Sequence, residues 1–365
     1  MIFQLGPVSL DIGGRYTTGI CNVVKELDIQ LSGALSNYKL LATNISTRLF
    51  FDNRSVYRID LLLKSLPVLV FLLFIRLSKF NFLSGFYGRI GALKLFYYSA
   101  VLLLLKSRKV LIHGIYYYWV SEILNFTDKK FLVVFHGYFE GKLGFESQLD
   151  DIRFNSNVRF SFLTDRMRDQ FVNRNEFIDG VVISNGVDKG FWKRCDDLME
   201  SRSSIRFITV ASVQSRKGQL WFYENCLKEL EIDWEYIIVG GLAHDNSSEY
   251  DGFFADSRIK YLGLISDRSA IREAYCSADI YAHVSTAEGQ ALSVLEASSL
   301  GLPIIVRDLI IDTLGDLEWY NILNVLDSSN PKLELTKSNV DRIVEPKVRG
   351  WDDVSSEYIA LLNQL

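Results

Sequence analysis

The stretch DIYAHVSTAEGQALSVLEASSLGLPIIV, residues 279–306, contains a complete strand, loop, helix and strand. The run DIYAHVST predicts a strand, the loop AEG follows it, and a helix is expected to begin near Gln290. Gly301 and Pro303 end that helix, since glycine favours a helix C-terminus and proline cannot continue the helix. A strand that leads through a helix into another strand is typical of a parallel sheet.

The same alternation extends along most of the chain. Short apolar runs bounded by turn residues occur at 2–5, 39–43, 109–114, 131–137, 158–164, 180–186, 205–212, 234–241, 259–265, 279–285 and 303–306. Helix-like segments lie between many of them, at 18–31, 164–172, 218–231, 269–278 and 289–300. A further strand is expected around residues 321–326. This order predicts an α/β, doubly wound fold.

The strands are too many for one small sheet, so we predict two Rossmann-like domains. The turn-rich segment NGVDKGFW, residues 185–192, marks the division between them. We place the first domain at residues 1–187 and the second at 188–348, followed by a closing helix within 349–365.

The composition describes a globular protein. Of the 365 residues, 48% are hydrophobic and 23% are charged, which excludes an intrinsically disordered chain and allows two cores. The four cysteines lie far apart without a CxxC pair, so neither a zinc site nor a disulfide framework is expected, and a reducing cytoplasm fits best. The N-terminus MIFQLGPVSLDIGG lacks the basic and then long apolar order of a signal peptide.

Charge is distributed unevenly along the chain. The chain carries 40 basic and 44 acidic side chains, but the segment 61–121 has eight basic and no acidic ones. Its apolar runs, LPVLVFLLFIRLSKFNF and LFYYSAVLLLLK, are shorter than the roughly 20 residues that cross a bilayer. We expect residues 61–83 to lie on an anionic membrane surface, with cations on the headgroups. The alternative, which we favour for the second run, is a core helix with solvated lysines.

Two glutamates of the opening stretch are candidates for ligand contacts. Glu288 follows the carboxyl end of a strand, where open α/β sheets bind ligands. The first helical amides, from Gly289 to Leu292, lack intrahelical partners and suit an anion. Glu296 lies among leucines, where a carboxylate is costly unless a group such as a sugar diol donates hydrogen bonds to it. Alternatively, Glu288 is a solvated loop residue and Glu296 forms a salt bridge.

The order S-x-x-E-G, E-x7-E and ASSLGLPIIV resembles the retaining glycosyltransferases of the GT-B fold, specifically family 4. The resemblance implies two Rossmann-like domains facing a cleft, with a C-terminal helix that crosses back to the N-terminal domain. It also implies that Glu288 lies beside the donor sugar and that Glu296 binds the ribose hydroxyls of the nucleotide. The neighbouring residues expected to bind the donor are Gly289, Gln290, Ala291 and Leu292.

Further motifs of that family occur in the same order along the chain. DIGGRYTTG is similar to its glycine loop, in which Gly13 and Gly14 would approach the donor phosphates. FLVVFHG is similar to the strand that ends in a histidine near the sugar, here His136. VASVQSRKGQ resembles the diphosphate loop, where Arg216 and Lys217 would meet the phosphate charge.

The histidines and Lys217 also have structural interpretations. His136 can be a strand-end residue without a ligand, and Lys217 can be an ordinary helix-start lysine. For His113, which also ends a strand, we favour a structural role. His244 and His283 are expected to be structural or at the surface.

The chain departs from the family pattern in two places. The family has glycine and arginine where this chain has Ala211 and Ser212, so one phosphate cation is missing unless Arg216 replaces it. The family's E-G-F-G stands here as E-G-Q-A, residues 288–291, which bears on sugar choice.

We therefore expect an enzyme that transfers a sugar, with retention, from a nucleotide-sugar donor to an acceptor hydroxyl. His136 and Glu288 are the expected catalytic residues, and their role is to orient the sugar. Because no D-x-D motif occurs, no metal or other cofactor is expected, and Lys217, Arg216 and helix amides would meet the diphosphate charge. The donor base is left open among UDP, GDP and ADP.

The expected acceptor is a saccharide or lipid-linked saccharide in bacterial surface polysaccharide biosynthesis, such as O-antigen, capsule or exopolysaccharide. The protein would then be cytoplasmic and peripheral on the inner face of the cytoplasmic membrane, without a nucleic-acid partner. Two alternatives stay open: a nucleotide-sugar epimerase, and a catalytically weak paralogue that acts as a binding or scaffold subunit. A dinucleotide dehydrogenase is disfavoured because DIGGRYTTG is not G-x-G-x-x-G.

Overall fold

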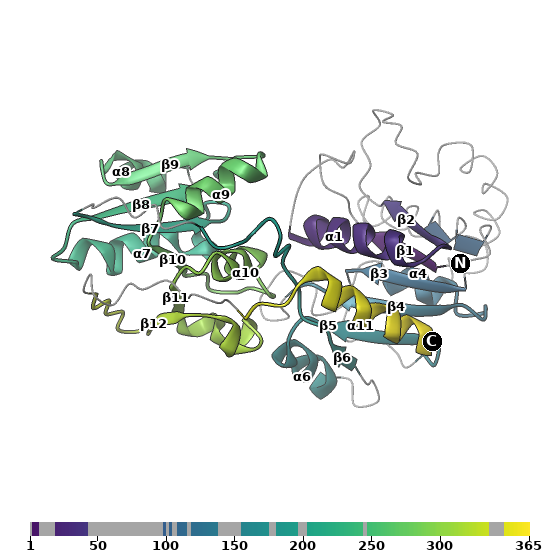
Figure 1. Ribbon diagram of the computed structural model, residues 1–365. Helices are drawn as coiled ribbons and strands as arrows, with labels where there is room; N and C mark the ends of the chain where they lie inside the picture. Colours follow the sequence, from purple (N-terminus) through teal and green to yellow (C-terminus); the bar gives the residue numbers. More distant parts are fainter. Residues whose placement is uncertain are drawn as a thin grey trace. The chain divides into compact units, whose positions relative to one another are not determined.

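The chain divides into two compact units. The computed structural model describes residues 2–6, 19–42, 98–99, 102–103, 108–114, 118–137, 155–174, 180–195, 203–243, 247–335 and 347–365. Unit 1 comprises Met1–Ser184 and Trp351–Leu365, and unit 2 comprises Asn185–Gly350 (Figure 1). Residues 61–83, for which membrane contact is predicted, lie outside the described residues.

Unit 1 is built on a six-stranded parallel sheet. Its strands, in spatial order, are β2 (Tyr38–Ala42), β1 (Ile2–Gly6), β3 (Lys109–His113), β4 (Lys130–Phe135), β5 (Val158–Phe162) and β6 (Gly180–Val182). The central strands are continuous apolar runs because both of their faces are buried. The strand order reverses between β1 and β3, which makes the carboxyl ends of these strands a topological switch point.

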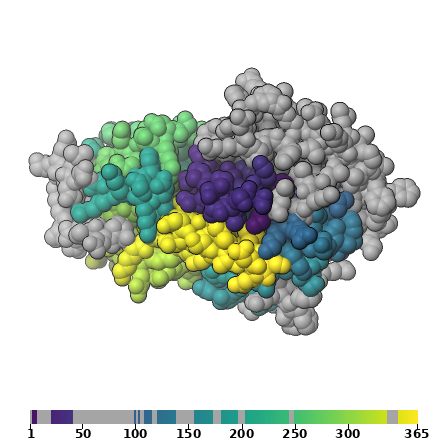
Figure 2. Space-filling view, turned by 45° about the vertical axis from the view of Figure 1, so that its right-hand side comes forward, coloured from purple at the N-terminus to yellow at the C-terminus, as the bar shows by residue number. Residues whose placement is uncertain are grey.

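The C-terminal helix packs on unit 1. Among the described residues of this unit, the helices are α1 (Gly19–Ala34), α4 (Tyr118–Ile123), α6 (Asp165–Arg174) and α11 (Trp351–Gln364). Figure 2 shows α1 and α11 side by side, and α11 buries Val354, Tyr358 and Leu362, which are spaced four residues apart. Lys109 Nζ donates to the carbonyl of Leu362 at 2.7 Å and so caps the last turn of α11. The predicted return of the chain to the first domain is confirmed.

Unit 2 contains a second six-stranded parallel sheet. Its strands, in spatial order, are β12 (Ile322–Leu326), β11 (Ile304–Arg307), β10 (Ile280–His283), β7 (Ile205–Val210), β8 (Trp234–Val239) and β9 (Ile259–Gly263). Successive residues of β7 face opposite cores, with Phe207 in one and Ile208 in the other. The strand order reverses between β7 and β10, so the expected ligand position lies at the carboxyl ends of these two strands.

Two helices of unit 2 differ from their predicted extents. The helices are α7 (Gln219–Asn225), α8 (Asp251–Ala255), α9 (Arg268–Cys276) and α10 (Leu292–Ser299), joined by the 3-10 segments η4 (Ser215–Lys217), η5 (Leu227–Glu229), η6 (Ser247–Tyr250), η7 (Asp308–Thr313) and η8 (Leu317–Trp319). The helix expected over 218–231 breaks at Cys226, and Leu227 then lies fully buried in the core. The helix expected to begin near Gln290 begins at Leu292.

The expectation of no disulfide is wrong for one pair of cysteines. Cys195 and Cys276 form a disulfide within unit 2, with their Cα atoms 5.6 Å apart. They lie 81 residues apart in the sequence, so their spacing gives no sign that the segment after Trp192 packs beside the end of α9. Cys21 and Cys226 are buried and keep their thiols.

Within the ranges that the structure describes, no helix combines the length and the apolar character that crossing a bilayer requires.

Candidate active site

Two loops meet at the switch point of unit 2, one after β7 and one after β10. The Thr286 amide donates to the Arg216 carbonyl at 2.8 Å, which fixes the second loop against η4. Gly218 permits this approach: its φ is 74°, and a Cβ there would lie 2.2 Å from the Val284 carbonyl oxygen. Segments 70 residues apart in the sequence thus form one site.

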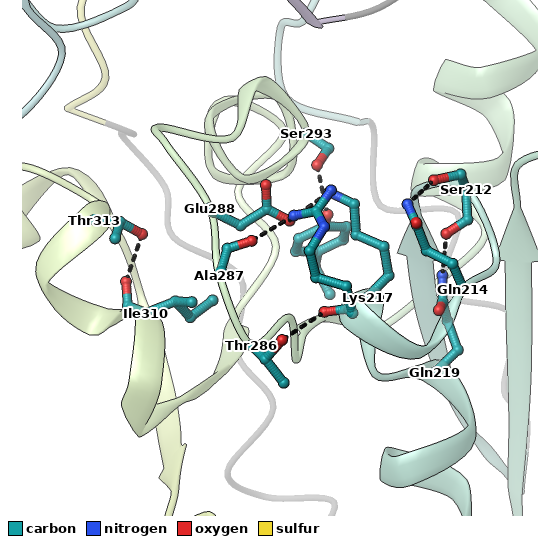
Figure 3. A network of polar contacts seen from close by, with 12 residues as sticks. Ser212, Gln214, Lys217, Gln219, Thr286, Ala287, Glu288, Ser293, Ile310 and Thr313 are labelled. Carbon is teal, nitrogen blue, oxygen red and sulfur yellow. Dashed lines mark hydrogen bonds and ion pairs between the residues drawn. The ribbon is translucent and has the colours of Figure 1, made fainter. Parts of the chain in front are cut away.

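Lys217, Arg216 and Glu288 form an ion-pair cluster on these loops. Lys217 Nζ donates a hydrogen bond to Glu288 Oε1 (Figure 3), and Arg216 Nη1 lies 3.5 Å from the same oxygen. Arg216 also donates to the Ala287 carbonyl. The side chains of Lys217 and Glu288 are only 15% and 11% exposed, whereas that of Arg216 is 42% exposed. Arg216 therefore points to the same place as Lys217 and stays accessible to an anion.

These cations hold Glu288 in its ionised form. Burial alone would raise the pKa of the carboxyl, but it is outweighed by the charge of Lys217, by that of His283 in acid where this ring is protonated, by the hydrogen bond from Lys217 and by the charge of Arg216. The pKa of Glu288 is lowered to about 2. At neutral pH this carboxylate can accept a hydrogen bond from a sugar hydroxyl, but it has no proton to give to a leaving group.

His283, the last residue of β10, is a member of this site that the sequence prediction missed. It is 3% exposed, and its pKa is lowered to about 4, chiefly by burial. Glu288, Lys217 and Arg216 all lie close enough to act on it electrostatically. Its Nε2 is buried and has no partner among the described residues. Its position at the carboxyl end of a strand, the criterion that selected Glu288, was the available signal.

The beginning of α10 offers backbone amides but not the Gln290 side chain. Ala291 stands at the N-cap and provides no side-chain hydrogen bond, so the first amides are open to an anion. Gln290 is buried; its Oε1 accepts from the Asn185 amide at 2.6 Å, and its Nε2 donates to the Leu314 carbonyl at 3.0 Å. Because the protein itself occupies both ends of this amide, the side chain is a structural anchor. Only the backbone of Gln290 is left to contact a nucleotide-sugar donor.

Glu296 has a protein partner for its carboxylate. The Tyr275 hydroxyl lies 3.3 Å from Glu296 Oε2 and 3.1 Å from the Ser293 carbonyl. Burial, and then the charge of Glu296, raise the pKa of Tyr275 well above its ordinary value, so this hydroxyl stays protonated. The Tyr275 hydroxyl is therefore one answer to the question of how an apolar helix face tolerates a carboxylate.

The loop after β7 has no cation at Ser212. The Ser212 hydroxyl accepts from Gln214 at 2.7 Å, and its carbonyl accepts from Gln219 at 3.0 Å (Figure 3). Gly240 lets this loop close against β8, since a Cβ there would lie 1.9 Å from the Ala211 carbonyl oxygen. The loop conformation is thus held by amide side chains, and the positive charge comes from Arg216 and Lys217.

His136 lies in unit 1, directly after β4, and is joined to His113. His113 Nδ1 and His136 Nε2 are 2.8 Å apart, and burial lowers the pKa of His136 to about 4. Gly6 leaves space for this arrangement, since a Cβ there would lie 3.2 Å from the Cβ of His113. The role expected of His113 as a structural residue therefore includes direct support of His136.

Some predicted site residues are not described by the structure. Gly13, Gly14 and His244 lie outside the described residues, so their roles stay predictions. Among the residues that are described, no three His, Cys, Asp or Glu side chains gather as metal ligands.

One known family matches a large part of the second unit. Residues 204–316 match the family model described as Glycosyl transferases group 1. No curated protein sequence matches the chain.

Solved structures match the whole chain. Sucrose-phosphate synthase from Thermosynechococcus elongatus has a TM-score of 0.69 at 13% identity, over 100% of this chain and 98% of that one. HepE of Anabaena, in complex with UDP and glucose, has a TM-score of 0.67 at 14% identity, over 100% and 99%. A trehalose-6-phosphate synthase has a TM-score of 0.65 at 12% identity, over 100% and 99%. At these identities the likeness establishes the fold.

The fold and the domain together define a glycosyltransferase of the GT-B type. Residues 204–316 form its glycosyl transferases group 1 domain, which contains Lys217, Glu288 and Glu296. The resemblance found in the sequence is confirmed at this level, and membership of family 4 stays a prediction.

Proposed function

We propose that the protein transfers a sugar from a nucleotide-diphosphate donor to an acceptor hydroxyl with retention of configuration. The observation that carries this proposal is the convergence of Lys217 and Arg216 on Glu288, beside the uncapped start of α10. Two cations and a set of backbone amides at a switch point suit a diphosphate, and a carboxylate among them suits a sugar hydroxyl.

Each residue of unit 2 receives a separate role in the proposal. Lys217 and Arg216 bind the diphosphate and neutralise it as it leaves, so we propose that no metal is needed. Glu288 accepts a hydrogen bond from the transferred sugar and stays ionised because of Lys217. Glu296 accepts from the ribose hydroxyls, while the Tyr275 hydroxyl holds its other side. In unit 1, His136 orients the sugar.

Structural neighbours support the donor class and the stereochemistry. The HepE structure holds UDP and glucose, and the trehalose-6-phosphate synthase structure concerns enzymatic glycosyl transfer with retention. Because the identities are 14% and 12%, these features come to this chain only as part of the proposal.

The proposed acceptor is a lipid-linked saccharide used in bacterial surface polysaccharide assembly. The support is the segment 61–121, which has eight basic and no acidic side chains and contains the apolar, aromatic residues 61–83. A peripheral position on the inner face of the cytoplasmic membrane belongs to the same proposal.

A test incubates the purified protein with UDP-, GDP- and ADP-sugars, with and without a lipid-linked saccharide, in EDTA. The proposal expects acceptor-dependent release of one nucleoside diphosphate and a product whose anomeric configuration, read by NMR, equals that of the donor. Acceptor-independent conversion to another nucleotide sugar would favour the epimerase. Donor binding without any turnover would favour the scaffold subunit.

A further inference from the structure

A chain of polar side chains crosses the sheet of unit 1 and ends at His136. Its members are Tyr38 on β2, Gln4 on β1, His113 on β3 and His136 after β4. These strands are neighbours in the sheet, in the order β2, β1, β3 and β4. Gln4 and His113 are 0% and 1% exposed, so their polar atoms depend on one another for hydrogen bonds. The Tyr38 hydroxyl is also within hydrogen-bonding reach of Asp28, so the hydrogen positions are worked out from Gln4 toward His136.

Val24 sets the orientation of the Gln4 amide. Gln4 Nε2 lies 3.2 Å from the Val24 carbonyl oxygen, which can only accept, so the amide nitrogen must face it. Gln4 Oε1 in turn accepts from the Tyr38 hydroxyl. The second hydrogen on Nε2 is then directed to His113 Nε2, 3.0 Å away.

The Gln4 amide leaves His113 with one neutral tautomer. Because its Nε2 accepts from Gln4, a neutral His113 must carry its hydrogen on Nδ1. His113 Nδ1 lies 2.8 Å from His136 Nε2, so His113 donates and His136 accepts. His136 must therefore carry its own hydrogen on Nδ1.

Both imidazoles are neutral near pH 7. Burial lowers the pKa of His136 to about 4. Burial, and then the charge of His136, lower the pKa of His113 well below its ordinary value. The ring centroids lie 5.1 Å apart, and His113 is 1% exposed, so a charge on the His113 ring would be poorly solvated.

We infer that Gln4 and His113 are positioning residues that hold His136 as a neutral Nδ1–H donor to an oxygen of the sugar or acceptor. The inference rests on the proposed function, in which His136 orients the sugar. The His136 ring is half-buried rather than fully buried, and its Nδ1 has no partner among the described residues. With Nε2 occupied by His113, this ring recognises an oxygen lone pair and does not act as a base.

The tautomers are tested first, by NMR on the full chain with 15N-labelled histidine. The chain has four histidines, so variants that lack one histidine each assign every ring signal. We expect two-bond 1H–15N correlations to show neutral Nδ1–H tautomers for both His113 and His136 between pH 6 and 8, roughly the range around the ordinary histidine pKa. An Nε2–H tautomer, or a charged His136 near pH 7, would overturn the inference whatever the activity of the protein.

The positioning role is tested with two substitutions of His113. In His113→Asn the amide nitrogen can still donate toward His136 Nε2, whereas His113→Leu offers no donor. We expect His113→Asn to keep the Nδ1–H tautomer of His136 and a kcat within about threefold of wild type, and His113→Leu to lose the single tautomer and about tenfold in kcat. Melting curves establish that both variants are folded.

Equal loss of kcat in folded His113→Asn and His113→Leu would overturn the positioning role. Gln4→Met provides a second route, because it removes the donor that selects the His113 tautomer while keeping a side chain of similar length. We expect a mixture of His113 tautomers in Gln4→Met, and an unchanged Nδ1–H tautomer would overturn the inference. If the wild type transfers no sugar, the proposed function fails, and the NMR measurement still decides the tautomers.

Discussion

Lys217 donates a hydrogen bond to Glu288, so the cation expected at the donor diphosphate is joined to the carboxylate expected at the sugar. An ammonium group carries three hydrogens, which allows Lys217 to hold Glu288 and a phosphate oxygen at the same time. The pair also connects the loop after β7 with the loop after β10. One side chain thereby links the two halves of the proposed donor subsite.

Gly218→Ala should destabilise unit 2 by about 2–4 kcal/mol, as read from urea unfolding. The φ of 74° is strained for alanine, and its Cβ would lie 2.2 Å from the Val284 carbonyl oxygen. Gly252→Ala in α8 is the matched control, because no atom lies within 4 Å of a Cβ there, and alanine should be neutral or stabilising by up to about 1 kcal/mol. Similar effects of the two substitutions would contradict the account of the loop contact.

Gln290→Leu should lower the free energy of unfolding by about 2–4 kcal/mol, because the Asn185 amide and the Leu314 carbonyl lose their partner. The affinity of the folded protein for a nucleotide should change by no more than about threefold, since this side chain faces the protein. Gln364→Leu, at an exposed position of α11, is the control: it removes only a solvent-exposed hydrogen bond from Arg159 and should change stability by no more than about 0.5 kcal/mol. A large loss of nucleotide affinity with unchanged stability would restore the predicted role of Gln290 in donor binding.

Stability should fall between pH 6.5 and 5 in part because of His283. Its folded pKa of about 4 lies below its unfolded value of about 6.5, so acid protonates the unfolded chain first and favours unfolding. The loss from this group at pH 5 is about 2 kcal/mol. The stability that Glu288 contributes through its lowered pKa is lost only below about pH 4.5, so the effects of the two groups fall in different pH ranges.

The measurement compares the free energy of unfolding at pH 7 and pH 5 in wild type and in His283→Leu. The variant should show a smaller difference between the two pH values, whatever its stability at pH 7. An equal difference in both proteins would show that His283 does not resist protonation in the folded state.

Glu296→Ala should weaken binding of a ribonucleoside diphosphate by about tenfold or more, because its carboxylate is proposed to accept from the ribose. The same substitution should have little effect on the affinity for a dideoxyribose analogue of that nucleotide, which lacks the ribose hydroxyls. Glu288→Ala should keep nucleotide affinity within about threefold and suppress sugar transfer. Equal loss of binding and transfer in both variants would contradict the separate roles.

Much of the fold follows from the sequence because strands and crossover helices are local patterns. All of the predicted strands occur, and the terminal helix packs on unit 1 as expected. The exact start of α10 could not be predicted, because Gln290 forms hydrogen bonds with Asn185 and Leu314, which lie 105 and 24 residues away in the sequence.

The site was predictable only in part. The strand-end position selected Glu288, and the motif resemblance selected Lys217 and Arg216. The pairing of Cys195 with Cys276 and the bond between His113 and His136 depend on tertiary contacts that no spacing reveals. His283 carried the strand-end signal, but its burial beside the cluster is visible only in the structure. These are the features in which the structure adds most.

The most direct test of the central claim is calorimetric titration of the protein with UDP, GDP and ADP. We expect one of them to bind wild type, and Lys217→Met to weaken that binding by about tenfold to a hundredfold, since a charged hydrogen bond is lost. Lys228→Met, which removes an exposed lysine paired with Glu224, should bind as wild type does. Absence of binding by all three nucleotides, or the same affinity in both variants, would contradict a diphosphate site at Lys217.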